Sequence, residues 1–213
     1  MSIADPISTA YARAALLRRG RLLAFLSMGY MVVEAGVSLV AGALAGSVAL
    51  MGFGLDSMIE LGSDAAALDR IAADHDPERR ARAERRAQRI IASLFAALAM
   101  YVTIDALLSL WLRAGAAPST PGIIVAATSV VIMPLLARAK RRVAAGLASR
   151  ALAADARQAD FCAYLSAIVL SGLLLNALLG WWWADSVAAL AMAPIIAREG
   201  VLGWRGAASC DVC

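Results

Sequence analysis

The sequence predicts an all-α fold: an integral membrane bundle of six transmembrane helices with both termini in the cytoplasm. The first reason is composition, because 62% of the 213 residues are hydrophobic, 17% are charged and the mean hydropathy is +0.73. Soluble domains average about 45–50% apolar residues. The second reason is that the apolar residues form six runs, each close to the roughly 20 residues that a membrane-spanning helix needs. The runs occupy residues 22–44, 46–68, 88–112, 121–138, 151–178 and 181–199.

The distribution of basic residues predicts the orientation. Most arginines and lysines precede the first run, follow the second and fourth runs or lie near the end of the chain, whereas the segments on the other side hold only Arg113. Cytoplasmic segments of membrane proteins are enriched in Lys and Arg. We therefore expect residues 1–21 to form a cytoplasmic arm, residues 22–199 the transmembrane domain and residues 200–213 a short cytoplasmic tail, in a bacterial inner membrane. Topology explains the basic clusters, so no nucleic-acid partner is expected.

The runs also carry local features that support their assignment. The first two are separated by almost no sequence around Gly42–Ser47, so they must form a tight antiparallel hairpin. The third ends at Trp111, before a turn-rich segment. The fourth contains Pro134, which we expect to kink it near the cytoplasm. The sixth opens with three tryptophans at residues 181–183, as is typical of an aromatic belt at a membrane surface.

The second run carries three acidic residues, Asp56, Glu60 and Asp64, at positions i, i+4 and i+8. Helical periodicity places them along one stripe. An acidic side chain at membrane depth costs about 2.5–3.5 kcal/mol or more, so such residues usually mark an ion pathway or an ion site. The alternative for Asp56 and Glu60 is a structural pair that hydrogen-bonds to neighbouring helices.

The fifth run carries a second polar stripe, because Asp155, Gln158 and Cys162 stand at positions i, i+3 and i+7. The two runs cross the membrane in opposite directions, so Asp64 and Asp155 are the cytoplasmic members of their stripes. If the stripes face each other, these two acids form a vestibule. The deep cluster then consists of Asp56, Glu60, Gln158 and Cys162.

The donor atoms of the deep cluster indicate which ion it would bind. Two carboxylates and a thiolate combine hard and soft ligands, and thiolate disfavours Ca²⁺ and Mg²⁺, which prefer oxygen. The set suits tetrahedral Zn²⁺ or Cd²⁺, with the Gln158 oxygen as a weak fourth ligand or as an orienting group. Carboxylates and thiols also bind protons, so metal and protons compete for the same atoms. This competition is the chemical basis of metal–proton antiport.

At these residues the sequence resembles the cation diffusion facilitator family of divalent-metal transporters. Gly46–Leu50 is similar to the Gly-Ser-x-Ala-Leu stretch that leads into the second span of the family. The family's first ligand pair, His/Asp-x-x-x-Asp, corresponds here to Asp56 and Glu60. Its second pair, His-x-x-x-Asp on the fifth span, corresponds to Gln158 and Cys162.

Two further motifs extend the resemblance over residues 22–200. Ala154–Ala156 resembles the Ala-Asp-Ala that precedes the second ligand pair, and Gly180–Asp185 resembles the opening of the sixth span. The resemblance implies export of zinc-like ions from the cytoplasm by alternating access, driven by protons, in a homodimer. The sequence looks most like the short subgroup without the cytoplasmic metal-binding domain that usually follows the sixth span. It departs from the family in having no histidine among the ligands, which affects the metal identity more than the transport role.

Further polar residues each have two alternative roles. Glu34 lines the cavity or hydrogen-bonds between helices, and Asp185 guides release near the outer surface or caps the sixth helix. His75 and the Cys210/Cys213 pair are candidates for weak metal capture in the cytoplasm, against the simpler interpretation of a solvated loop and tail.

Two acidic residues have an alternative to the vestibule. Asp64 and Asp155 could instead be ion-pair partners of nearby arginines, and for Asp160 an arginine partner is the preferred interpretation. The arginines considered for the first two are Arg70, Arg150 and Arg157.

The sequence thus predicts a transporter rather than an enzyme, with Zn²⁺ or Cd²⁺ as transported substrate and no prosthetic group. Its partners are divalent metal ions, protons, the lipid bilayer and a second copy of the chain. Three alternatives stay open. One is a membrane protein that binds metal to regulate a partner without transport. Another is export of manganese, iron or cobalt, and the third is transport of small organic cations by an acidic site that does not need the thiol.

Overall fold

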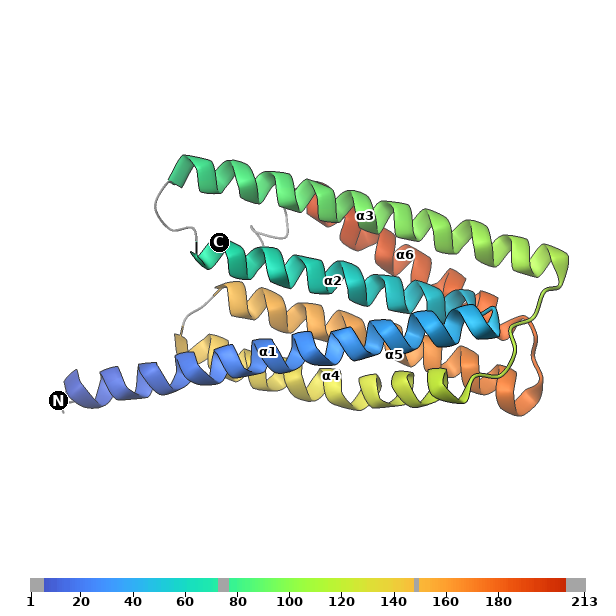
Figure 1. Ribbon diagram of the computed structural model, residues 1–213, viewed down its shortest axis with the longest axis horizontal. Coiled ribbons are helices and arrows are strands. Elements are labelled where there is room, and N and C mark those ends of the chain that lie inside the picture. Colours follow the sequence, from blue (N-terminus) through green and yellow to red (C-terminus); the bar gives the residue numbers. More distant parts are fainter. Residues whose placement is uncertain (1–5, 73–76, 148–149, 206–213) are drawn as a thin grey trace.

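The computed structural model describes residues 6–72, 77–147 and 150–205, and these residues form six helices and no strand (Figure 1). The helices are α1 (Pro6–Ala45), α2 (Val48–Ala72), α3 (Pro77–Leu112), α4 (Thr120–Leu147), α5 (Arg150–Leu179) and α6 (Ala184–Trp204). Each of them overlaps one of the six apolar runs, so the predicted all-helical bundle is confirmed.

The connection between α1 and α2 is the tight turn that the sequence predicts. Gly46 has a φ of +64°, in the left-handed region that suits glycine at the end of a helix. Ser47 follows, and its side-chain Oγ accepts a hydrogen bond of 3.1 Å from the amide of Leu50. A serine in this position satisfies one of the free amides at the start of a helix. The two helices therefore pack side by side as an antiparallel hairpin.

At one end of the bundle the helices are longer than the apolar runs. α1 begins at Pro6 rather than near residue 22, α3 begins at Pro77 rather than near residue 88, and α4 continues to Leu147 rather than ending near residue 138. Apolar content marks only the part of a helix that lies in hydrocarbon. The adjoining segments are rich in Ala, Arg, Glu and Gln, which are good helix formers and continue the helix beyond that part.

Judged only on the residues whose side chains the structure describes, five of the helices are long and apolar enough to cross a membrane, and α2, described in this way only over residues 48–62, is not among them. α2 carries Asp56, Glu60 and Asp64 within its 25 residues. These acidic residues lower its mean hydropathy. The same helix packs against α1, α3, α5 and α6. The helix with the acidic stripe is therefore in the middle of the bundle, and Figure 1 shows α2 and α5 between the α3/α6 pair and the α1/α4 pair.

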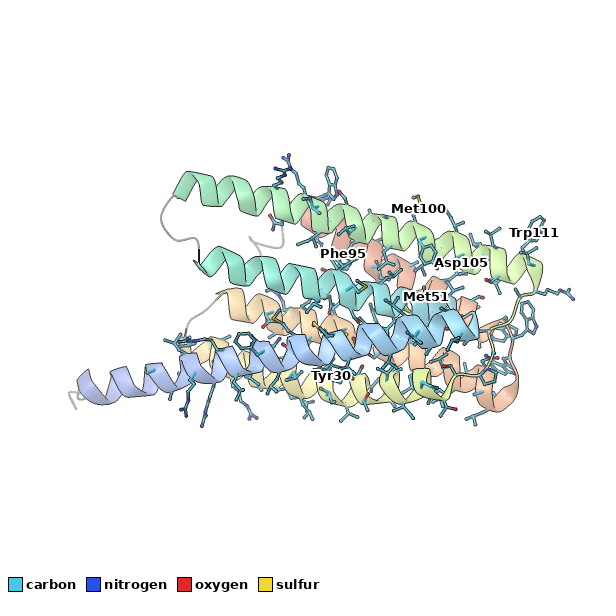
Figure 2. The ribbon with its side chains drawn as sticks, in the orientation of Figure 1. Tyr30, Met51, Phe95, Met100, Asp105 and Trp111 are labelled. Atoms are coloured by element: carbon cyan, nitrogen blue, oxygen red, sulfur yellow. The ribbon has the colours of Figure 1, made fainter. Side chains whose placement is uncertain are left out.

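The surface and the interior have the polarity of a membrane protein. Large apolar side chains such as Leu44 and Trp111 are more than 80% exposed on the outside, whereas polar side chains such as Glu34 and Glu60 are fully buried. Figure 2 shows Trp111 and Met100 pointing away from the bundle. Small residues let the helices approach closely, as in membrane bundles generally. A Cβ added at Gly54 would lie 3.0 Å from the backbone nitrogen of Leu39.

The two ends of the bundle differ in charge. We call the end that holds the starts of α1, α3 and α5 the basic end. Its described basic residues include Arg18, Arg19, Arg21, Arg86, Arg89, Arg138, Arg141, Arg142 and Arg205. The opposite end has tryptophans at residues 181–183, of which Trp181 and Trp183 stack with ring centroids 4.9 Å apart. This asymmetry agrees with the orientation that the sequence predicts.

Candidate functional site

A cluster of buried polar side chains lies inside the bundle, contributed by four helices. Glu34 comes from α1, Asp56 and Glu60 from α2, Ser129 from α4 and Cys162 from α5, and all five are fully buried. Each polar group in such an environment must find a hydrogen-bond partner or a counter-charge to offset its loss of water. Their partners therefore indicate which of them are structural.

Glu34 is the best-connected member of the cluster. Its carboxylate accepts hydrogen bonds from Ser57 Oγ at 2.6 Å and from Ser129 Oγ. The thiol of Cys162 also donates to Glu34 Oε1, with a sulfur–oxygen distance of 3.4 Å. The Tyr30 hydroxyl, one turn away on α1, forms a 2.7 Å hydrogen bond with Ser129 Oγ. Glu34 thus joins α1 to α2, α4 and α5, as the alternative of a hydrogen bond between helices requires.

The link between Glu34 and Cys162 was not predicted from the sequence, although α1 carries a polar stripe that indicates a face directed into the bundle. Ser27, Glu34 and Ser38 stand at i, i+7 and i+11 and share one face of the helix. All three are fully buried. A polar stripe on an otherwise apolar helix favours a position inside the bundle.

Glu60 and Gln158 connect the acidic stripe on α2 with the polar stripe on α5. The Gln158 amide nitrogen donates to Glu60 Oε1 at 2.7 Å. This bond joins α2 directly to α5 at the level of the cluster. Cys162 stands one turn further along α5 and interacts electrostatically with Glu34, Asp56 and Glu60.

Asp56 differs from the other members. Its side chain is fully buried, and neither carboxylate oxygen accepts a hydrogen bond from the part of the chain that the structure describes. Its electrostatic neighbours include two further carboxylates, Glu34 and Glu199. A buried anion without compensation costs several kcal/mol. Asp56 is therefore the member of the cluster at which a cation or a proton would be most stabilising.

The four predicted ligands, Asp56, Glu60, Gln158 and Cys162, are thus neighbours in one polar region. Among the side chains that the structure describes, however, no three of His, Cys, Asp or Glu are arranged to hold one metal ion together. The described arrangement contains instead two separate hydrogen bonds, one between Gln158 and Glu60 and one between Cys162 and Glu34.

Asp155 has a different ion-pair partner from those considered from the sequence. Its carboxylate lies 2.6 Å from Nζ of Lys140 on α4, and the lysine side chain is fully buried. Five residues further along α5, Asp160 pairs with Arg141, which confirms the expected arginine partner. These two pairs hold α4 against α5 at the basic end. The backbone of Asp64 belongs to α2, but its side chain lies outside the described part of the structure, so the vestibule of Asp64 and Asp155 stays a prediction.

Asp185 caps a different helix from the one predicted. It lies in the first turn of α6 and is 1% exposed, but its carboxylate accepts hydrogen bonds from the start of α2. Ser47 Oγ donates at 2.5 Å, the Val48 amide at 2.8 Å and the Ala49 amide at 3.4 Å. A carboxylate at this position complements the positive end of the α2 dipole. His75, Cys210 and Cys213 lie outside the described residues.

A comparison with known protein families identifies the family of this chain. The family model of the cation efflux transmembrane domain matches residues 24–202. The chain belongs to the cation efflux family. No curated protein matches the chain. The matched region reaches from α1 into α6 and contains every member of the polar cluster. This cation efflux protein is therefore a multi-pass membrane transporter of divalent cations, and the resemblance noted in the sequence is confirmed at the level of the family.

Proposed function

We propose that this cation efflux transporter exports zinc, and also cadmium, from the cytoplasm in exchange for protons. In the proposal Asp56, Glu60 and Cys162 bind the ion and Gln158 completes its shell. The observation that carries it is the fully buried Asp56 carboxylate, which accepts no hydrogen bond from the described residues and lies among other acidic groups and a thiol.

The donor set supports zinc or cadmium over harder ions. A thiolate is a soft ligand that suits Zn²⁺ and Cd²⁺, while Mg²⁺, Ca²⁺ and Mn²⁺ prefer shells of oxygen. In the described arrangement the Cys162 thiol donates a hydrogen bond to Glu34, and the Gln158 amide donates a hydrogen bond to Glu60. To ligate a cation, the thiol must lose its proton and the amide must turn its oxygen to the ion. Binding would therefore exchange these two hydrogen bonds for metal–ligand bonds.

Proton exchange follows from the same chemistry. The carboxylates and the thiol each bind either a proton or the metal, so metal binding releases protons and low pH weakens it. Alternating access would expose the cluster to the two sides in turn. The proposal includes a homodimer in a bacterial inner membrane with the basic end in the cytoplasm, as the basic residues and the family resemblance favour.

The proposal is tested with the purified protein in lipid vesicles that have an acidic interior. We expect zinc to accumulate inside when the proton gradient is imposed and not when it is collapsed. Asp56→Asn keeps the shape of the side chain but removes its charge, and should lower the uptake rate at least about tenfold, because even changes around metal ligands cost about 10–100-fold.

The matched control is Asp160→Asn, which removes a carboxylate that pairs with Arg141 at a partly exposed site. Exposed ion pairs contribute about 0–1 kcal/mol, so uptake should stay close to that of the unmodified protein. Protein that binds zinc but moves none under the gradient would instead be the metal-binding regulator. Uptake that is the same in Asp56→Asn and in the control would remove Asp56 from the site.

A further inference from the structure

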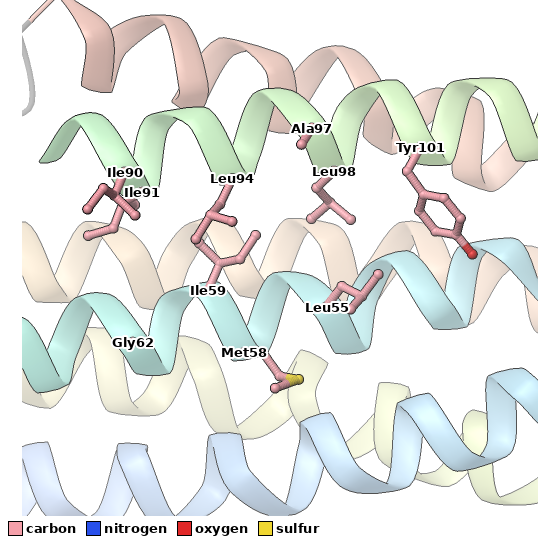
Figure 3. Close-up of a pocket in the computed structure, with 10 residues that line it drawn as sticks. All are labelled: Leu55, Met58, Ile59, Gly62, Ile90, Ile91, Leu94, Ala97, Leu98 and Tyr101. Atoms are coloured by element: carbon pink, nitrogen blue, oxygen red, sulfur yellow. The ribbon is translucent and has the colours of Figure 1, made fainter. Parts of the chain in front are cut away.

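An apolar groove of about 630 Å³ runs between α2 and α3 on the outside of the bundle. Figure 3 shows the side chains that line it, with Leu55 and Ile59 on α2 facing Leu94 and Leu98 on α3. Tyr101 supplies the one polar group among the ten lining residues. The volume falls within the roughly 300–1,000 Å³ of typical small-molecule sites. The groove is therefore large enough for a specific apolar ligand.

The length of the groove matches one leaflet of a bilayer. On α3 its lining extends from Ile90 at the basic side to Tyr101 toward the opposite end. At about 1.5 Å per residue this stretch is ~16 Å long. The hydrocarbon core of a bilayer is about 30 Å thick, so that one leaflet supplies ~15 Å. An extended acyl chain lying along the groove would thus have the length that its leaflet provides.

The basic side of the groove carries positive charge. Arg86 precedes Ile90 by four residues, on the same stripe of α3 as Ile90 and Leu94, and Arg89 directly precedes Ile90. Both arginines are exposed. Arginines next to the hydrocarbon boundary attract anionic headgroups. Positive charge at one end of an apolar groove is complementary to an anionic phospholipid.

We propose that the groove between α2 and α3 binds one acyl chain of an anionic phospholipid from the leaflet at the basic end, with the headgroup at Arg86 and Arg89. The acyl chain would contact Leu55 and Ile59, which directly precede Asp56 and Glu60 on α2. Occupancy of the groove would therefore fix the position of the acidic helix relative to α3. This binding depends on membrane insertion and on the groove, and does not depend on which cation is transported.

Native mass spectrometry of the purified full-length protein in neutral detergent tests the proposal. Phosphatidylglycerol and phosphatidylcholine with identical chains are titrated separately. We expect the affinity for the first bound phosphatidylglycerol to be on the order of tenfold higher than that for the first bound phosphatidylcholine, because two arginines attract its anionic headgroup. The double variant Arg86→Gln/Arg89→Gln should lose this preference. Arg142→Gln, which removes an exposed arginine from α4, should keep it.

Filling the groove is the second arm of the experiment. Ala97→Trp on α3 and Met58→Trp on α2 each add bulk at the lining, and both should lower binding of the two lipids alike. The two variants change different helices, so if one of them fails to fold, the other still tests the groove. If Arg142→Gln abolishes the preference as well, the charge effect is diffuse and the proposal is wrong. If the tryptophan variants leave lipid binding unchanged but convert a dimer to a monomer, the groove is an interface between copies of the chain.

Discussion

Two buried carboxylates in the bundle, those of Glu34 and Asp56, differ in the hydrogen bonds that they accept. Glu34 accepts hydrogen bonds from Ser57, Ser129 and Cys162, whereas Asp56 accepts none from the described residues. A carboxylate with several donors is stabilised by the fold itself. One without donors is stabilised only by binding a cation or a proton. The contrast favours Asp56 for the ion and gives Glu34 the structural role of joining four helices.

Cys162 should determine metal preference at the residue scale. Cys162→Asp replaces a soft ligand by a hard one, so we expect the ratio of cadmium to zinc transport to fall on the order of tenfold, while zinc is still moved. The measurement is uptake of zinc, cadmium and manganese into vesicles under the same proton gradient.

The control for this change is Ser166→Ala. Ser166 lies one turn from Cys162 and donates its hydroxyl to the carbonyl of that residue, so the change affects the same part of α5 without altering the thiol. It should leave the cadmium-to-zinc ratio unchanged. An unaltered ratio in Cys162→Asp itself would mean that the thiol is not a ligand.

At the scale of elements, α2 is held at its start and bonded to α5 through Glu60. Ser47 caps the helix within its own chain segment, and Asp185 caps it from α6. Together these groups satisfy amides that would otherwise be buried without partners. The start of the acidic helix is therefore tied to α6.

Removing the Asp185 cap should loosen the start of α2. Substituting a capping residue by alanine costs about 0.5–2 kcal/mol. We expect Asp185→Ala to lower the apparent melting temperature and to speed hydrogen exchange at the amides of Val48 and Ala49. Asp185→Asn keeps one acceptor oxygen and should lie between the alanine variant and the unmodified protein. Equal protection of these amides in all three proteins would show that the cap does not hold the helix.

A second connection between elements is the contact of α4 with α5 at the basic end. Lys140 and Asp155 form a buried pair, and Arg141 and Asp160 form a more exposed one. The Lys140–Asp155 pair joins residues 15 positions apart on two helices. Helix packing places Lys140 next to Asp155, and an unpaired ammonium in this position would be costly.

At the scale of the whole molecule, the bundle has a basic end and an opposite end with stacked tryptophans. The starts of α1, α3 and α5 lie at the same end because successive helices are antiparallel, as Figure 1 shows. Charged residues at that end continue the helices beyond their apolar parts. The orientation in the membrane follows from which end carries the positive charge.

The orientation is tested by cysteine labelling of intact cells with a thiol reagent that does not cross membranes. In a protein whose own cysteines are replaced by serine, Pro118→Cys lies between α3 and α4 at the opposite end and should be labelled. Arg142→Cys lies at the basic end and should be labelled only after the cells are opened. The reverse pattern would show that the basic end faces outward.

Periodicity and composition by themselves determined the helical membrane class, the six helices and the polar stripes on α2 and α5. These features depend on residues close together in sequence, where hydropathy and the helical repeat suffice. Only the tertiary structure decided that Asp185 caps α2, that Lys140 pairs with Asp155 and that Cys162 donates to Glu34. The first and the last of these contacts join residues more than 100 positions apart. Such pairings depend on how each helix is rotated against its neighbours, and several acidic and basic residues are equally suitable partners until that packing is known.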